Sequence, residues 1–173
     1  TNSRGDVVAT QYVTPTSGTW TWAYPTAQSD GNYTLTATIV DTAGTRLNNA
    51  AVGQATQQVV VDTTAPTTLA EVTAINDNEG NVQGVVATGG TTDDTTPGVS
   101  GTLNAALATG ETVRVYDGST YLGNATIAVG STTWTFADPR TLNNGATVSY
   151  TARVADTALN QSVAGTAYTA TIN

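Results

Sequence analysis

The side chains best suited to chemistry in this sequence are carboxylates. The chain contains 13 Asp and Glu residues and five Arg residues, but it contains no Lys, His or Cys. Oxygen atoms from carboxylates, carbonyls and waters are the ligands that Ca²⁺ takes in proteins. We therefore predict bound Ca²⁺, although Asp residues also populate turns by hydrogen-bonding to their own backbone. The candidate metal ligands are Asp62, Asp30, Asp77, Glu79, Asp93, Asp94, Glu111 and Asp156.

Catalysis has little support in this composition. The absence of His removes the commonest general base at neutral pH, and the absence of Cys removes a common nucleophile. Asp93 and Asp94 form an adjacent acidic pair, but neighbouring residues in a strand point to opposite faces. A glycosidase needs two carboxylates that face each other across a cleft. The sequence therefore predicts a protein that is not an enzyme.

Charge and hydropathy exclude two classes of partner. The net charge of −8 argues against nucleic-acid binding, which requires a basic surface. No run of about 18 apolar residues is present, so we expect no membrane insertion. The chain lacks an initiator Met and starts within a repeat, which predicts that it is a piece of a longer protein.

The elements that position the carboxylates are predicted to be strands. Thr and Val are abundant, and β-branched side chains favour the pleated surface of a sheet. Short apolar runs alternate with turn residues, which is typical of an all-β sandwich. The predicted strands are 68–75, 82–87, 99–103, 112–116, 121–127, 133–137, 147–155 and 163–172.

An internal repeat divides the chain. The segment Trp20-Thr21-Trp22-Ala23-Tyr24-Pro25 returns as Trp134-Thr135-Phe136-Ala137-Asp138-Pro139, and the similarity extends in both directions. We predict that residues 1–62 are the C-terminal half of a repeat and that 63–173 form a complete one. A half-repeat exposes unpaired strand edges, which either residues outside the sequence or another chain would have to cover.

The repeated aromatic residues have two interpretations. Trp20, Trp22, Trp134 and Phe136 could line a groove for a carbohydrate or another ligand. A buried Trp is also the usual centre of an immunoglobulin-like core. Because the pair recurs at the same place in both units, we predict that these residues are core anchors.

Asp62 is the strongest functional candidate because it lies where one unit ends and the next begins. Chain direction in a sandwich alternates, so Asp62 and Asp30 should share one end of the first unit. Glu111 and Asp156 should share the end of the second unit that faces them. The sequence therefore predicts Ca²⁺ at this junction, whereas the positions of the other four acidic residues stay open.

Several motifs resemble bacterial immunoglobulin-like (BIg) repeats of giant, type I-secreted adhesins, including biofilm-associated proteins. They are Val61-Asp62-Thr63-Thr64-Ala65-Pro66, Asn76-Asp77-Asn78-Glu79-Gly80, Thr92-Asp93-Asp94-Thr95-Thr96-Pro97, Val115-Tyr116-Asp117-Gly118, Trp134-x-Phe136 and Ala152-Arg153-Val154-Ala155-Asp156. Where the family typically has Gly-Asn, this sequence has Leu159-Asn160.

The resemblance implies tandem immunoglobulin-like sandwiches that form a secreted, cell-surface stalk, stiffened by Ca²⁺ between domains. The partners it implies are neighbouring repeats of the same chain and host-cell or biofilm-matrix ligands. The alternative is a module that recognises a glycan or a host receptor.

Overall fold

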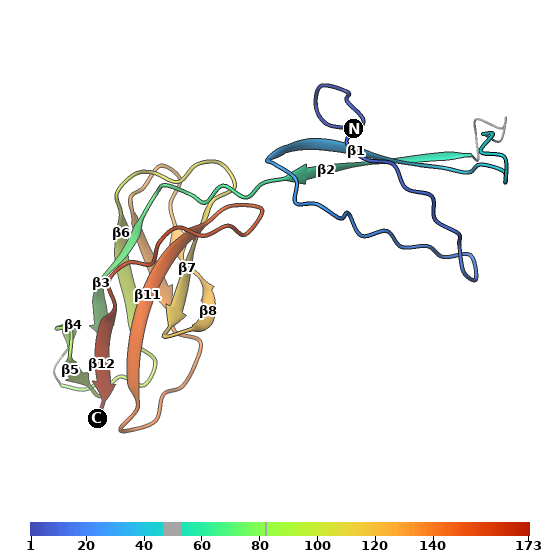
Figure 1. Ribbon diagram of the computed structural model, residues 1–173. Helices are drawn as coiled ribbons and strands as arrows, with labels where there is room; N and C mark the ends of the chain where they lie inside the picture. The colour runs from blue at the N-terminus through green and yellow to red at the C-terminus, as the bar shows by residue number, and fades with distance from the viewer. Residues whose placement is uncertain (47–52, 82) are drawn as a thin grey trace. The chain divides into compact units, whose positions relative to one another are not determined.

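The structure, a computed structural model, describes residues 1–46, 53–81 and 83–173 (Figure 1). These residues form strands and loops and no helix, which confirms the prediction of an all-β fold. The chain divides into two compact units, Thr1–Thr64 and Ala65–Asn173.

The second unit is a sandwich of two five-stranded sheets (Figure 1). The first sheet has the order β4-β3-β6-β10-β9, and the second has the order β5-β12-β11-β7-β8. The strands of the first sheet are β3 (Ala70–Asp77), β4 (Gly84–Val86), β6 (Gly98–Leu103), β9 (Thr126–Ile127) and β10 (Thr133–Ala137). The strands of the second are β5 (Gly90–Thr92), β7 (Thr112–Asp117), β8 (Thr120–Asn124), β11 (Thr147–Ala155) and β12 (Tyr168–Ile172).

The candidate acidic ligands of the second unit lie at its two opposite ends. Strand β3 begins beside the turn at Glu111 and the loop that starts at Asp156, and we call this the Glu111 end. Strand β3 finishes at Asp77, next to Thr92 and the C-terminus, and we call this the Asn173 end.

The core lies between the two sheets and is centred on Trp134, which is 1% exposed. Along β7, Val113 and Val115 are fully buried, as their alternation predicts. Trp134 packs on the backbone of β6, because a Cβ added at Gly101 would lie 2.2 Å from its Cζ2 atom. Phe136 is partly buried against the same core. The prediction that Trp134 and Phe136 are core residues is therefore confirmed.

Three strand predictions for the second unit differ from the structure. The run 121–127 is two strands, because the chain leaves the second sheet after β8 and joins the first as β9. The run 163–172 forms a strand only over Tyr168–Ile172. Residues Gly90–Thr92, which lie outside the predicted strands, form β5 and pair parallel to β12. Predicted strand 82–87 corresponds to β4, while Val82 lies outside the described residues.

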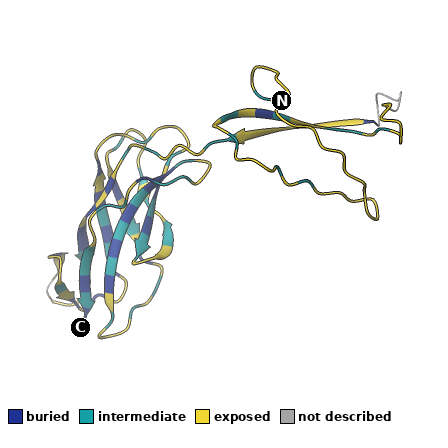
Figure 2. Ribbon diagram, in the orientation of Figure 1, coloured by how far each residue is buried: buried dark blue, intermediate teal, exposed yellow. Residues whose placement is uncertain are grey.

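The first unit contains one antiparallel pair, β1 (Gly31–Thr38) and β2 (Gln54–Val61). The repeat aligns β1 with β11, so this pair corresponds to β11 and β12 of the second unit. Among its described residues, Tyr33 is the single large hydrophobic side chain that is buried, and most of the unit is exposed (Figure 2).

The prediction that Trp20 is a core anchor is wrong, because this side chain is 51% exposed. Trp22 is half-buried and packs on Tyr24 with 5.3 Å between the ring centroids, outside any enclosed core. In the second unit, the equivalent Trp134 packs on β6 within the core between the two sheets, and the described part of the first unit has no counterpart to β6.

Candidate cation-binding residues

Asp30 and Asp62 lie together at one end of the β1–β2 pair. Asp30 directly precedes Gly31 and Asp62 directly follows Val61, and these two residues form the last pair of the ladder. Asp30 Oδ1 accepts hydrogen bonds from the Thr63 backbone amide at 2.8 Å and from the Thr63 hydroxyl at 2.6 Å, and Oδ2 accepts one from the Thr64 hydroxyl. These bonds, chiefly the one from the Thr63 hydroxyl, lower the pKa of Asp30. Asp62 Oδ1 accepts from the Thr64 amide at 3.0 Å. The two carboxylates therefore fix the last residues of the first unit.

Glu111 and Asp156 lie at the Glu111 end of the second unit, where β7 and β11 pair. Glu111 accepts a hydrogen bond from the Ala108 amide at 2.8 Å. Asp156 accepts bonds from the Asn160 amide and from its side-chain nitrogen, both at 2.9 Å. Each carboxylate thus closes the turn in which it lies.

Asp77 and Asp94 lie at the Asn173 end, where Thr92 links them. Asp77 Oδ2 accepts a hydrogen bond from the Thr92 hydroxyl at 2.7 Å, and that hydroxyl accepts one from the Asp94 amide at 3.1 Å. The Asp94 side chain is fully buried and accepts from the Thr96 amide at 2.7 Å and the Asn78 amide at 3.3 Å. These bonds hold the connections that follow β3 and β5.

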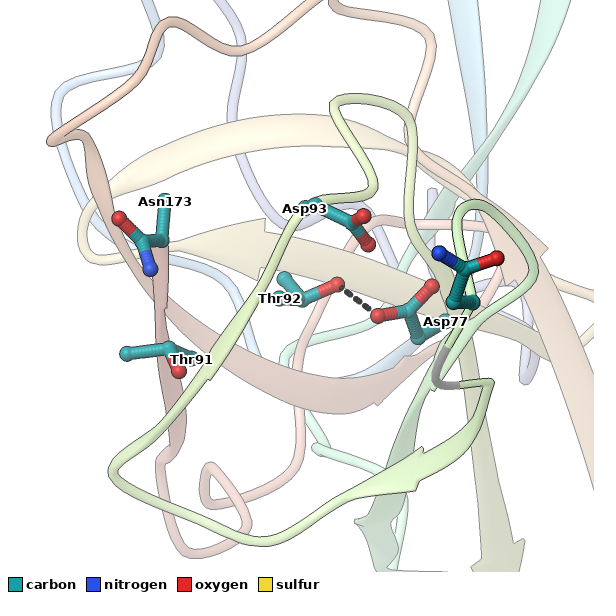
Figure 3. Close-up of a pocket in the computed structure, with 6 residues that line it drawn as sticks. Asp77, Thr91, Thr92, Asp93 and Asn173 are labelled. Carbon is teal, nitrogen blue, oxygen red and sulfur yellow. Dashed lines mark hydrogen bonds between the residues drawn. The ribbon is translucent and has the colours of Figure 1, made fainter.

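A pocket of about 420 Å³ lies beside these residues at the Asn173 end. Its lining residues are Asp77, Asn81, Thr91, Thr92, Asp93 and Asn173. Figure 3 shows the carboxylates of Asp77 and Asp93 turned toward one another. The Asp93 carboxylate also lies against the backbone of Gly80. Only a glycine fits there, because a Cβ at this position would lie 2.1 Å from Asp93 Oδ2. Glu79 is exposed in the same loop.

The predicted ligands therefore fall into separate small groups within each unit. Among the described residues, no group of three or more His, Cys, Asp or Glu side chains is arranged to hold a metal ion. The first unit brings Asp30 and Asp62 together, and the second separates Glu111 and Asp156 from the four acidic residues at the Asn173 end. The donor atoms of each group are oxygens, which suit a hard cation such as Ca²⁺.

A charged network at the edge of the core was missed by the sequence reasoning. Arg140 donates to both oxygens of Asp138, with Nε–Oδ1 at 2.9 Å and Nη2–Oδ2 at 2.7 Å, and Nη1 donates to Asp117 at 2.9 Å. The hydroxyl of Tyr150 donates to Asp138 Oδ2, and both residues are buried. The Ser149 amide donates to the other oxygen of Asp117 at 2.8 Å. The network ties the end of β10 to β7 and β11.

The network shifts the pKa of Asp138 and of Tyr150. Burial alone raises the pKa of Asp138, but the hydrogen bonds from Arg140 and Tyr150 outweigh it and the pKa is lowered overall. Burial, reinforced by the Asp138 carboxylate, raises the pKa of Tyr150. The phenol is therefore a hydrogen-bond donor at every physiological pH.

Two packed sheets, antiparallel except for the β5–β12 pair, surround a buried Trp and define the second unit as an immunoglobulin-like β-sandwich. Residues 2–63, in the first unit, match the family model described as a bacterial Ig-like domain. The match covers about a third of the chain and confirms the resemblance to bacterial Ig-like repeats. No curated protein matches the chain. In the part of the chain that the structure describes, no helix is long and apolar enough to cross a membrane.

Proposed function

We propose that this chain is a non-catalytic spacer segment of a secreted bacterial surface adhesin, serving adhesion or biofilm formation. The observation that carries the proposal is the repeated strand pair, since β1–β2 has the same antiparallel pairing as β11–β12 and ends in hydrogen-bonded acidic residues. A repeated body whose carboxylates fix loops suits a structural role better than a single reactive site.

The mechanism that we propose is restraint of the segment that leaves the first unit. Asp30 binds Thr63 and Thr64 through three hydrogen bonds, and Asp62 binds the Thr64 amide. Pro66 follows two residues later and restricts the backbone further. A short, restrained segment of this kind narrows the range of angles that consecutive repeats adopt.

We further propose that Ca²⁺ reinforces this restraint, with Asp62 and Asp30 as its first ligands. The hydroxyls of Thr63 and Thr64 and nearby backbone carbonyls add oxygen donors of the kind that Ca²⁺ prefers. A dissociation constant on the order of 10⁻⁴ to 10⁻³ M is typical of extracellular calcium modules. Such an affinity is sufficient where calcium is millimolar.

Small-angle X-ray scattering on arrays of one, two and three copies of the chain tests the spacer proposal. The maximum dimension should grow in proportion to the number of copies. A dimension that stays almost constant would show that the arrays collapse, and it would exclude a spacer role.

The calcium proposal is tested on the single chain, with and without a chelator. Calcium should raise the melting temperature and narrow the scattering distance distribution of the wild type, and Asp62→Asn should abolish both effects. Asp6→Asn is the matched control, since Asp6 lies in the same unit and its ion pair with Arg4 is exposed. An unchanged melting temperature and maximum dimension would remove calcium from the mechanism.

A second candidate function is assembly through the first unit. Several of its apolar side chains are exposed, with Val7 at 71%, Tyr12 at 73% and Val60 at 70%. In the second unit, β7 pairs with the edge of β11 that is equivalent to the outer edge of β1, where Thr34 exchanges backbone hydrogen bonds with Thr1. Strands from another chain could therefore complete this unit. Sedimentation equilibrium tests this proposal. If the chain is monomeric at about 100 µM, self-association with a dissociation constant below about 100 µM is excluded.

A further inference from the structure

Two arginines lie directly opposite one another on the second sheet of the second unit. Arg114 on β7 pairs with Arg153 on β11. They are two of only five basic residues in a chain with a net charge of −8. Like charges in directly opposite positions destabilise a sheet. Another interaction must therefore offset the repulsion between the two guanidinium groups.

Aromatic rings supply part of that compensation. The guanidinium carbon of Arg114 lies 4.0 Å from the ring centroid of Tyr121, and that of Arg153 lies 5.8 Å from the centroid of Tyr116. The two Tyr rings pack with their centroids 5.5 Å apart. A cation over an aromatic face is attracted by the negative face of the ring. We call Arg114, Arg153, Tyr116 and Tyr121 the Arg–Tyr face.

No carboxylate completes the compensation within the described residues. The ion pairs found there join Arg4 to Asp6 and Arg140 to Asp117 and Asp138. Neither Arg114 nor Arg153 takes part in one. The Nε atom of Arg114 is buried and has no hydrogen-bond partner. Each guanidinium carries five N–H donors in a planar fork that matches a carboxylate.

We propose that the Arg–Tyr face binds the carboxylate of an acidic sugar, such as a uronic acid unit of a polysaccharide. The two guanidiniums present the charge and fork geometry that a carboxylate requires. The proposal goes beyond the spacer function, because it assigns a ligand to a face that a pure spacer does not use.

The surroundings of the face favour a sugar over an acidic peptide. The Tyr121 hydroxyl donates to Asn124 Oδ1 at 2.8 Å, and both side chains are exposed. This hydroxyl and the amide nitrogen of Asn124 lie beside the arginines and suit the hydroxyl groups of a sugar. Strand β8, which carries Tyr121 and Asn124, is an edge strand of its sheet, and among the described residues no further strand pairs with it.

Titration of the chain with trigalacturonate, followed by NMR chemical-shift changes, tests the proposal. We expect shifts at the Arg–Tyr face, a dissociation constant in the millimolar range and weaker binding at high salt, since the face is only half-buried. Arg153→Gln should weaken binding at least fivefold. Arg46→Gln is the matched control, because Arg46 is an exposed Arg of the first unit. Maltotriose, which has no carboxylate, should not bind.

Each contrary outcome overturns the assignment. Equal weakening by Arg46→Gln would show that binding reflects general charge. No binding at about 10 mM trigalacturonate, or equal binding of maltotriose, would exclude an acidic-sugar site. Equal binding of a tri-aspartate peptide would assign the face to protein carboxylates instead. Arg114→Lys gives a second variant that keeps the charge but loses the fork, and it should also weaken binding.

Discussion

Removing the hydroxyl of Tyr150 is the sharpest test of how the second unit is held together. In Tyr150→Phe, the buried carboxylate of Asp138 loses a hydrogen bond but keeps those from Arg140. A hydrogen bond to a charged group contributes about 1.5–3 kcal/mol to stability. The aromatic ring stays, so no cavity of consequence forms. We therefore expect the free energy of unfolding to fall by about 1.5–3 kcal/mol.

Urea denaturation monitored by Trp fluorescence measures this loss. Trp20→Phe and Trp22→Phe in the background make Trp134 the reporter, so the signal comes from the second unit. The matched control is Tyr168→Phe, since the Tyr168 hydroxyl donates to the neutral Val86 carbonyl at 2.8 Å. The control should lose only about 1 kcal/mol.

A double-mutant cycle and the pH dependence complete the test. Asp138→Asn combined with Tyr150→Phe should cost less than the sum of the single changes, because both act on one hydrogen bond. The pKa of Asp138 is lower in the folded state than in the unfolded state. The ionised carboxylate therefore contributes its full share of the folding free energy above the ordinary Asp pKa, and this share is lost as the pH falls through the lowered pKa. The wild type should therefore lose its advantage over Asp138→Asn below about pH 4.

Two results would refute this reasoning. The first is a loss below about 0.5 kcal/mol in Tyr150→Phe, which is smaller than a charged hydrogen bond provides. The second is an equal loss in Tyr168→Phe, which would show that the charge of the acceptor makes no difference to the loss.

Four further substitutions test the structure within each unit by urea denaturation. Trp134→Ala should cost about 3–5 kcal/mol, whereas Trp20→Ala should cost less than about 1 kcal/mol because Trp20 is exposed; equal costs would contradict the assigned burial. Gly101→Ala should destabilise by at least about 2 kcal/mol, since its Cβ would meet Trp134, and a neutral result would show that this contact relaxes freely. Leu159→Gly should stabilise by roughly 1 kcal/mol, because Leu159 has a φ of 68°, and a loss of stability would show that its side chain compensates for this strain.

Local patterns predicted the strands of the second unit well where one strand alternates within one sheet. The run 147–155 coincides with β11, because its apolar residues recur at every second position and face the core. The run 121–127 was not resolved into two strands, since nothing in its alternation signals a change of sheet. The Ala125 amide donates to the Val113 carbonyl at 2.8 Å at that change.

The side-chain partners were less predictable, because they depend on contacts between distant parts of the chain. Trp20 and Trp134 occupy equivalent sequence positions, but only Trp134 has β6 to pack on and a second sheet to cover it. The bond between Tyr150 and Asp138 joins β11 to the loop that follows β10, and no local spacing indicates it. Leu159 was recognisable as a departure from the usual Gly, and its positive φ shows what that Gly provides.

The places where the chain enters and leaves the sandwich determine how it resists pulling. Strand β3 begins at the Glu111 end, and β12 finishes at the Asn173 end, held between β5 and β11 (Figure 1). Tension applied to the two ends of the second unit therefore runs along these strands and loads their hydrogen bonds in shear. The bonds must then break together instead of one after another. Because forced unfolding depends on the unfolding rate, the unit is built to yield slowly under load.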